Sequence, residues 1–428
     1  MKKVDADRFL NSDVLFDILS RVPAKDLLDL KCVSREWRRI ISSRSFMKAQ
    51  LAKNTEMVLT GFIFQEKFKW CNEDIKTVSY ISVGGSKVHH MIFDFLPEDV
   101  VMLASCKGLV CCRSCFPSEK PVIYVCNPSN KEWIKLEWPG SGYYRYESIA
   151  LAFDFDPFKD SIIDPLKMFK LVRVKQVVNS NGVEEEDLYF TFELYSRGAW
   201  RKSSEMCRCD NKLIKSKGVY IGGVFHWLTD CDQVLTFDVE KELSWLISVP
   251  VPASEFWAVP EACIGESEGR LHYVLVSEEG LHVWYLEDYY EFKWTLSYCK
   301  SLDEIEGEYP QFFINLKERV MHRMSMGNNP WMNPLAFKDG LLLMKVCVNM
   351  YLYDLKHNKV AEACSIEDLN SLCMSNPTVL PHSLSLIPPL SFRVQILQIR
   401  HPGIDVILTV DNIRFSSLAA NNSRSILL

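Results

Sequence analysis

The feature that most constrains the fold of this chain is a short unit that recurs along it. Each copy has a glycine turn, an apolar strand, a loop and a second apolar strand that leads into a polar turn. Four copies begin near Gly108, Gly223, Gly269 and Gly340. One such unit cannot bury its apolar face alone, so the copies must pack on one another. The repeat therefore predicts a fold built from several similar sheets.

The spacing of the glycines predicts how these sheets follow one another. The steps from Gly223 to Gly269 and on to Gly340 are 46 and 71 residues. The shorter step is near the kelch period of about 50, and the longer one implies an insertion. The 115 residues between Gly108 and Gly223 leave room for a further unit. Its candidate strands are 153–156, 169–172 and 192–195.

We expect residues 53–415 to form an all-β, kelch-like β-propeller, because a closed ring leaves few open sheet edges. Strands at 391–399 and 406–410 are expected to close this ring against a strand near 57–64. Residues 416–428 are expected to form a flexible tail. A β-sandwich is the competing fold, and the number of blades stays open.

Residues 1–52 follow a helical period instead, so the chain is predicted to be an α+β multidomain protein. Ser12 is a candidate cap for a first helix, and Ser34 is one for a third. Three or four short helices in about fifty residues cannot bury all of their apolar faces against each other. The remaining apolar surface marks a partner-binding site or a contact with the rest of the chain. The apolar face of the first helix consists of Val14, Leu15, Ile18 and Leu19.

The residues of these helices carry a resemblance. Leu10–Leu28 and Leu30–Ile41, followed by Phe46, resemble the two halves of an F-box. F-boxes bind the small adaptor subunit of cullin–RING ubiquitin ligases, so the resemblance implies which residues contact that adaptor or hold the motif together. The family usually has Pro after the leading Leu, whereas this chain has Asn11, itself a good capping residue. The implied adaptor-binding residues are Leu10, Leu15, Ile18, Leu19, Val22, Pro23, Leu27, Leu30, Val33 and Trp37.

The region from about 100 to 300 resembles the C-terminal F-box-associated domain of the large plant F-box family, which is kelch-like. The resemblance implies a domain that binds a target protein. It rests on elements that occur in the family's order. These are Cys126-Asn127-Pro128, Phe153–Pro157, Glu193–Ser196 with Trp200, Gly223–Leu228 with Phe237-Asp238, and His282–Leu286 with Trp294.

Composition excludes several classes of protein. The formal net charge is −6, which gives no sign of a nucleic-acid partner. Residues 1–50 hold 11 Lys and Arg against 7 Asp and Glu, a balance of +4, so the remainder carries −10. No signal peptide and no run of roughly 18 apolar residues is present, and the 15 cysteines are expected to be reduced. We therefore expect a cytoplasmic or nuclear protein without a membrane partner.

Three patterns suggest chemistry but have simpler structural interpretations. Gly265–Gly269 matches the G-x-S-x-G nucleophile elbow, yet a strand rather than a helix is expected after it. Cys112 and Cys115 form a C-x-x-C pair without the second pair that a zinc site needs. His226 and His272 occupy equivalent places in two repeats, which favours a structural role. We therefore expect no catalytic residue, cofactor or metal, although a propeller enzyme stays a third possibility.

Together these observations predict a non-catalytic substrate-recognition subunit of an adaptor–cullin–F-box ubiquitin ligase. It would promote ubiquitin transfer by holding a target protein close to the other subunits. The alternative is a non-ligase β-propeller scaffold. Aromatic residues in loops are the candidates for target binding, because loops on rigid scaffolds carry recognition. They are Tyr143, Tyr144, Tyr146, Trp257 and Trp331.

Overall fold

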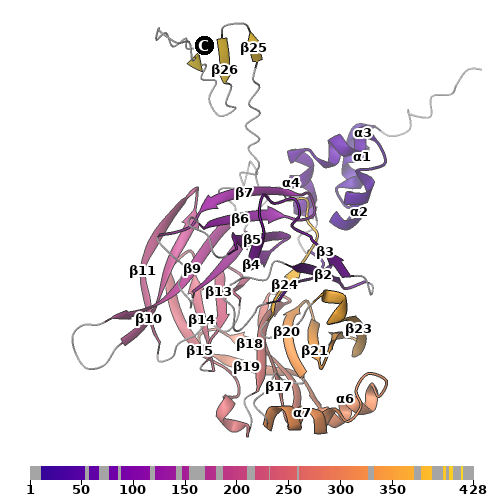
Figure 1. Ribbon diagram of the computed structural model, residues 1–428, viewed down its shortest axis with the longest axis vertical. Coiled ribbons are helices and arrows are strands. Elements are labelled where there is room, and N and C mark those ends of the chain that lie inside the picture. Colours follow the sequence, from indigo (N-terminus) through magenta and orange to yellow (C-terminus); the bar gives the residue numbers. More distant parts are fainter. Residues whose placement is uncertain are drawn as a thin grey trace, which may run out of the picture.

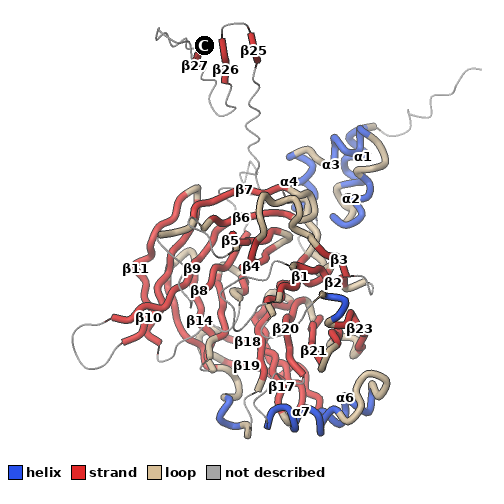
Figure 2. Tube along the Cα trace, viewed as in Figure 1, coloured by secondary structure: helices blue, strands red, loops and turns tan. Residues whose placement is uncertain are grey.

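In the computed structural model, a ring of sheets carries a small helical module at one edge (Figures 1 and 2). Within the described part of the chain, no helix is both long and apolar enough to cross a membrane. The structure describes residues 11–53, 57–66, 77–84, 88–115, 121–140, 147–153, 169–179, 187–209, 217–230, 232–257, 260–325, 332–370, 377–387, 399–401, 404–407 and 416–417.

The helical module consists of α1 (Ser12–Leu19), α2 (Ala24–Leu30), α3 (Arg35–Ile41) and α4 (Arg44–Lys53). Asn11, rather than the expected Ser12, caps α1, because its side-chain oxygen accepts a hydrogen bond from the Asp13 amide. Ser34 caps α3 as expected, accepting from the Trp37 amide at 3.1 Å. The core of the module is formed by the buried side chains of Leu15, Leu19, Leu27, Ile41 and Phe46.

The first three blades of the ring are sheets of four strands, ordered from the innermost strand outwards. Blade 1 contains β24 (Thr378–His382), β1 (Gly61–Gln65), β2 (Val78–Ser82) and β3 (Val88–His90). Blade 2 contains β4 (Val100–Cys106), β5 (Leu109–Ser114), β6 (Val122–Asn127) and β7 (Glu132–Glu137). Blade 3 contains β8 (Glu147–Phe153), β9 (Phe169–Asn179), β10 (Asp187–Ser196) and β11 (Ala199–Cys209).

The other three blades follow the same order. Blade 4 contains β12 (Val219–Ile221), β13 (Val224–Leu228), β14 (Gln233–Asp238) and β15 (Leu243–Ser248). Blade 5 contains β16 (Glu261–Ser267), β17 (Arg270–Ser277), β18 (Gly280–Asp288) and β19 (Lys293–Ser301). Blade 6 contains β20 (Met332–Lys338), β21 (Leu341–Val346), β22 (Asn349–Asp354) and β23 (Lys359–Ser365).

The innermost strands show that the ring is closed. Each contacts the next in the cycle β24, β4, β8, β12, β16, β20 and back to β24. Blades 5 and 6 even join into one eight-stranded sheet, through a short parallel pairing of β16 with β20. Gly265 makes this pairing possible, since a Cβ atom there would lie 2.0 Å from the Phe337 carbonyl oxygen. The prediction of a β-propeller is therefore confirmed, and the β-sandwich alternative is wrong.

The strand that closes the ring is not one of those expected. β24, at Thr378–His382, pairs antiparallel with β1 at Gly61–Gln65 and joins the two ends of the propeller. The predicted partner near 57–64 is right, but the predicted closing strands at 391–399 and 406–410 are wrong. Residues 391–398 and 408–410 lie outside the described residues. β26 (Ile404–Ile407) pairs instead with β25 (Ile399–His401) and β27 (Ser416–Ser417).

The glycine repeat corresponds to the second and third strands of blades 2, 4, 5 and 6. Blade 3 fills the long gap between Gly108 and Gly223, as expected. The long step to Gly340 contains an insertion, α6 (Leu302–Glu308) and α7 (Leu316–Ser325), which packs on blades 5 and 6. Two short 3-10 helices, η2 (Ala253–Glu255) and η3 (Glu367–Leu369), precede β16 and β24.

Blade 3 contains a buried ion network. The Arg173 guanidinium, which has no exposed surface, pairs with the carboxylates of Glu147 and Glu193. Its charge also lies over the Trp138 ring, 5.0 Å from the ring centroid, and it donates to the Pro139 carbonyl. Because burial strengthens such interactions, the network fixes β8, β9 and β10 relative to each other. Glu193, the first residue of the Glu193–Ser196 motif, therefore has a structural role.

Candidate functional site

Nine of the ten predicted adaptor-binding residues lie within the described residues, and they fall into three groups by burial. Leu15, Leu19 and Leu27 are buried and hold the module together. Ile18, Pro23 and Val33 are exposed and are therefore accessible to a partner. Leu10 lies outside the described residues, and the remaining predicted positions, Val22, Leu30 and Trp37, are half-buried.

Three large apolar side chains in the described part of this module face solvent. Val14 is 46% exposed, Ile18 is 48% exposed and Val33 is 61% exposed. The sequence analysis placed Val14 on the apolar face of the first helix, four residues before Ile18, but did not include it among the implied adaptor-binding residues. We call Val14, Ile18 and Val33 the exposed apolar set. Arg35, Arg38 and Arg39 are exposed as well and add positive charge to α3, the helix that follows Val33.

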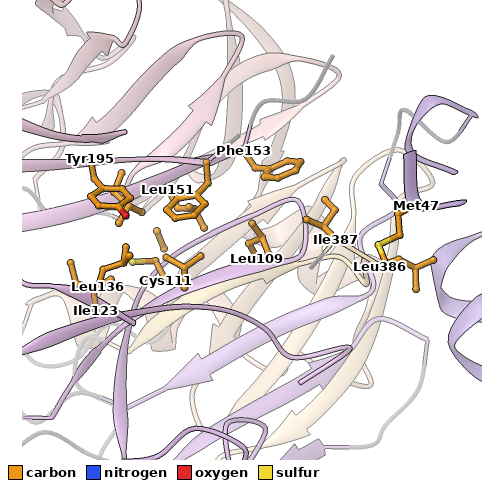
Figure 3. Close-up of a cluster of buried hydrophobic side chains, with 14 of the residues drawn as sticks. Met47, Leu109, Cys111, Ile123, Leu136, Leu151, Phe153, Tyr195, Leu386 and Ile387 are labelled. Atoms are coloured by element: carbon orange, nitrogen blue, oxygen red, sulfur yellow. The ribbon is translucent and has the colours of Figure 1, made fainter. Parts of the chain in front are cut away.

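The module also packs against the propeller. Its buried residues belong to one hydrophobic cluster with residues of blades 2 and 3, and Figure 3 shows Met47 of α4 beside Leu386. Lys31, at the end of α2, is half-buried at this contact. The burial lowers the pKa of its ammonium group, while the carboxylate of Glu132 at the start of β7 opposes the shift. Part of the apolar surface of the module is thus covered by the same chain, and the exposed apolar set is not.

The two faces of the ring can be distinguished from its topology. Neighbouring strands within a blade run antiparallel, so turns after first and third strands lie on one face. Connections after second and fourth strands lie on the other face. Residues 383–387 follow β24, which is a first strand, and they contact Met47. The helical module therefore sits on the face of the first-strand and third-strand turns.

Among the predicted target-binding residues, Trp257 alone lies within the described residues. It follows η2 in the connection from β15 to β16, on the face opposite the helical module, and its side chain is 55% exposed. Its backbone amide donates to the Glu278 carboxylate at 3.0 Å, which ties the connection to the β17–β18 turn. Tyr143, Tyr144, Tyr146 and Trp331 lie outside the described residues.

Two exposed aromatic residues were not predicted from the sequence. Tyr290 is 91% exposed and Phe292 is 44% exposed, and both lie in the β18–β19 turn. This turn follows a third strand, so it lies on the same face as the helical module and opposite Trp257. Asp288, the polar residue that ends β18 two positions before Tyr290, could have indicated that a turn follows. The exposed aromatic residues of the propeller therefore do not gather on one face.

The residues that suggested chemistry are structural in the described part of the chain. Ser267 ends β16, and Glu268 and Gly269 form the hairpin turn to β17 with positive φ angles, so the G-x-S-x-G match is a turn. His226 is buried, with Nδ1 3.3 Å from the Val219 carbonyl oxygen and Nε2 3.1 Å from the Tyr289 hydroxyl. This burial lowers its pKa to about 4.

The thiols of the C-x-x-C region are similarly placed. Cys112 lies in β5 without exposed surface, and burial raises the pKa of its thiol. Cys115, just after β5, is half-buried. Within the described ranges, no three His, Cys, Asp or Glu side chains are arranged to hold a metal ion.

Comparisons with known proteins agree with this architecture. A family model for the F-box domain matches residues 9–49, and one described as "F-box protein At3g26010-like, beta-propeller" matches residues 76–320. The F-box protein At5g49610 of Arabidopsis thaliana is 27% identical, over 70% of this chain and 81% of that protein. The F-box protein At5g07610 of the same plant is also 27% identical, over 70% and 72% of the two chains.

Proposed function

Because this chain belongs to the F-box proteins with an At3g26010-like β-propeller, we propose that it is a substrate-recognition subunit of an adaptor–cullin–F-box ubiquitin ligase. F-box domains generally bind the adaptor of such complexes. The observation that carries the proposal is the exposed apolar set on an F-box whose own core is already formed. Apolar side chains left exposed on so small a module indicate a partner surface.

In this proposal the protein is not itself catalytic. The F-box, residues 1–52, binds the adaptor and through it the cullin. The kelch-like propeller, residues 53–415, binds a target protein, with Trp257 as a contact. Ubiquitin transfer is then promoted by proximity, since holding two reactants together removes much of the entropic cost of their encounter. The complex would act in the cytoplasm or the nucleus.

The charge distribution supports the same arrangement. The F-box segment carries a net charge of +4 over residues 1–50, against −10 for the remainder. Arg35, Arg38 and Arg39 are exposed on α3, the helix that follows Val33. A basic rim around apolar contacts suits an acidic adaptor surface and would accelerate association at low ionic strength.

The structure indicates which variant tests this proposal. Leu15 is buried, so replacing it would damage the fold as well as the binding surface. Ile18→Asp combined with Val33→Asp instead places charges in the exposed apolar set. We expect the affinity for the purified adaptor to fall at least tenfold, because about 1.4 kcal/mol corresponds to tenfold and two desolvated carboxylates cost more than that.

A matched control is Val58→Asp, which also replaces an exposed apolar residue but lies after α4. It should bind the adaptor like the wild type, and all three proteins should melt at the same temperature. Binding by calorimetry and recovery of adaptor and cullin from plant extract give the two measurements. If the wild type recovers neither subunit, the ligase proposal is wrong and the non-ligase scaffold takes its place.

A further inference from the structure

The Cys126-Asn127-Pro128 motif has a role that the proposed function does not use. Asn127 ends β6, the third strand of blade 2, and its side-chain oxygen accepts a hydrogen bond from the Ser129 amide at 2.9 Å. Carboxylates occupy the same place in three other blades. Asp238, Asp288 and Asp354 each accept a hydrogen bond from a backbone amide of the following turn. Capping this turn therefore needs only an acceptor oxygen.

The amide nitrogen of Asn127 makes contacts that a carboxylate could not make. It donates to the backbone carbonyls of Ser385 at 3.0 Å and Ile387 at 2.7 Å. The Asn127 side chain has no exposed surface, so both contacts are shielded from water. Without the Asn127 amide, the Ser385 carbonyl would lose this donor, and the Ile387 carbonyl would keep a longer contact of 3.4 Å from the Asn130 amide nitrogen. Taking hydrogen-bond donors away from buried carbonyl groups costs free energy. The amide thus holds residues 383–387, which we call the closing extension because they directly follow β24.

A second contact holds the closing extension from the side. Gly108, in the β4–β5 turn, has a φ of +81°, and a Cβ atom there would lie 2.2 Å from the Cβ of Ser385. The extension therefore passes directly over the backbone of this turn. Its last two residues, Leu386 and Ile387, are buried in the cluster that also contains Leu109 and Phe153. The extension is an ordered part of blade 2 rather than a free end.

The F-box rests on this extension. Met47 of α4 is buried in the same cluster, and Figure 3 shows it beside Leu386, with Ile387, Leu109 and Phe153 continuing into the propeller. The position of the F-box is therefore connected to blade 2 through the closing extension.

We propose that Asn127 is a positioning residue that sets the orientation of the F-box relative to the propeller. It acts through the closing extension, which forms the seat for α4. The seating itself is independent of the proposed function. Its consequence, that a target is presented to the ligase in one fixed direction, rests on that function.

The variant that isolates this role is Asn127→Asp in the full chain. Ionised aspartate keeps the acceptor oxygen for the turn, as in blades 4 to 6, but has no proton to donate to the two carbonyls. We expect amide hydrogen exchange to accelerate at least tenfold in residues 383–387 and in α4, and to stay within twofold in β13 and β17. Small-angle scattering should show a larger maximum dimension. The reverse exchange in blade 4, Asp238→Asn, is the matched control and should change neither measurement.

Two results would overturn the proposal. One is unchanged exchange in α4 of the Asn127→Asp protein, and the other is equal acceleration in all strands, which would make Asn127 a purely structural residue. Met47→Ala provides a second test from the F-box side, because it leaves the blades intact. It should accelerate amide hydrogen exchange in the closing extension. Unchanged exchange there would contradict the proposal that the extension forms the seat for α4.

Adaptor binding separates this inference from the proposed function. The Asn127→Asp protein should bind the purified adaptor within twofold of the wild type, because the exposed apolar set is untouched. In a reconstituted ligase its own ubiquitination should change in rate and in the lysines used. If the wild-type protein does not bind the adaptor, the ligase proposal is refuted, but the hydrogen-exchange result for Asn127→Asp remains valid.

Discussion

The F-box and the propeller differ in how completely each buries its apolar residues. The propeller stacks six sheets in a ring, so each blade covers its neighbour, as where Phe192 stacks on Phe237 at 4.2 Å across blades 3 and 4. The F-box has four short helices and leaves Val14, Ile18 and Val33 exposed. The ring also exposes apolar side chains, but they are spread over a much larger domain, and Trp257 lies on the face opposite Tyr290 and Phe292. The difference indicates the F-box as the first place to look for a partner surface.

The largest expected effect tests whether the stability of the propeller depends on the buried ion pairs of blade 3. Arg173→Ala removes the buried guanidinium that pairs with the Glu147 and Glu193 carboxylates in blade 3, although Glu193 keeps its ion pair with Lys175. Breaking a buried ion pair by removing one member costs about 3–5 kcal/mol, so we expect a fall of that size in the free energy of unfolding. Urea unfolding followed by tryptophan fluorescence measures it.

Arg201→Ala is the matched control for this prediction. It removes an arginine from the same blade, but the Arg201 side chain is half exposed and pairs with Glu242 at the surface. Such pairs contribute about 0–1 kcal/mol. An equal loss in the two variants would show that the interior of blade 3 depends no more on pairing than its surface does.

The next prediction concerns how pH changes the stability of the propeller, which contains buried histidines, compared with that of the F-box. Burial lowers the pKa of His226 and of His382 to about 4, whereas residues 11–53 contain no histidine. The unfolded chain, with a histidine pKa near 6.5, binds protons that the folded ring does not, so stability falls as pH drops from about 6.5 towards 4. At pH 5 the loss is about 2 kcal/mol for each of these histidines.

Urea unfolding at pH 7 and pH 5 tests this expectation. The double variant His226→Gln, His382→Gln should lose less stability between the two pH values than the wild type. His357→Gln, at an exposed turn, should behave like the wild type. A pH dependence that persists unchanged in the double variant would place the responsible groups elsewhere.

Much of the difference between the helical F-box and the β-propeller could be predicted from the sequence, because helix periods and glycine turns are local signals. The first and third F-box helices begin within one residue of the places that their candidate caps predicted, and the four glycine repeats became second and third strands. Blade 3 was harder to recognise, since its first turn carries no glycine. The exposed apolar set depends on which helix faces pack on the propeller, and this is not a local property.

The closing strand was missed for a specific physical reason. β24 contains Pro381, and proline inside a run of residues argues against a strand, because it cannot donate a ladder hydrogen bond. β24, however, is the innermost strand of blade 1 and pairs with β1 on one side. An edge strand tolerates proline. Neither this edge position nor the role of Asn127 leaves a signal in the local sequence.

A smaller effect tests how marginal the F-box is. Ser34→Ala removes the side-chain acceptor for the Trp37 amide at the start of α3. Loss of such a cap costs about 1 kcal/mol. We expect exchange of the α3 amides to accelerate several-fold while the ring strands stay unchanged. Ser42→Ala, at the other end of α3, is the control, and equal effects would argue against a specific role of the cap.

The smallest effect concerns the departure of this F-box from its family. Asn11 has a φ of −55°, which lies in the range that proline adopts. Asn11→Pro should therefore fit the backbone, losing the side-chain cap but restricting the unfolded chain. We expect its adaptor affinity to stay within about threefold of the wild type, a difference below 1 kcal/mol. A tenfold gain by calorimetry would show that Asn11 weakens binding.

The position of β24 also has a consequence for synthesis. The F-box helices are translated first, whereas the seat under α4 is completed by residues 383–387, after nearly all of the propeller has been made. A chain interrupted before residue 378 would carry an F-box without its seat, beside a ring that lacks its last strand. An F-box that is seated on residues 383–387 therefore indicates that the propeller has been synthesised through its last strand.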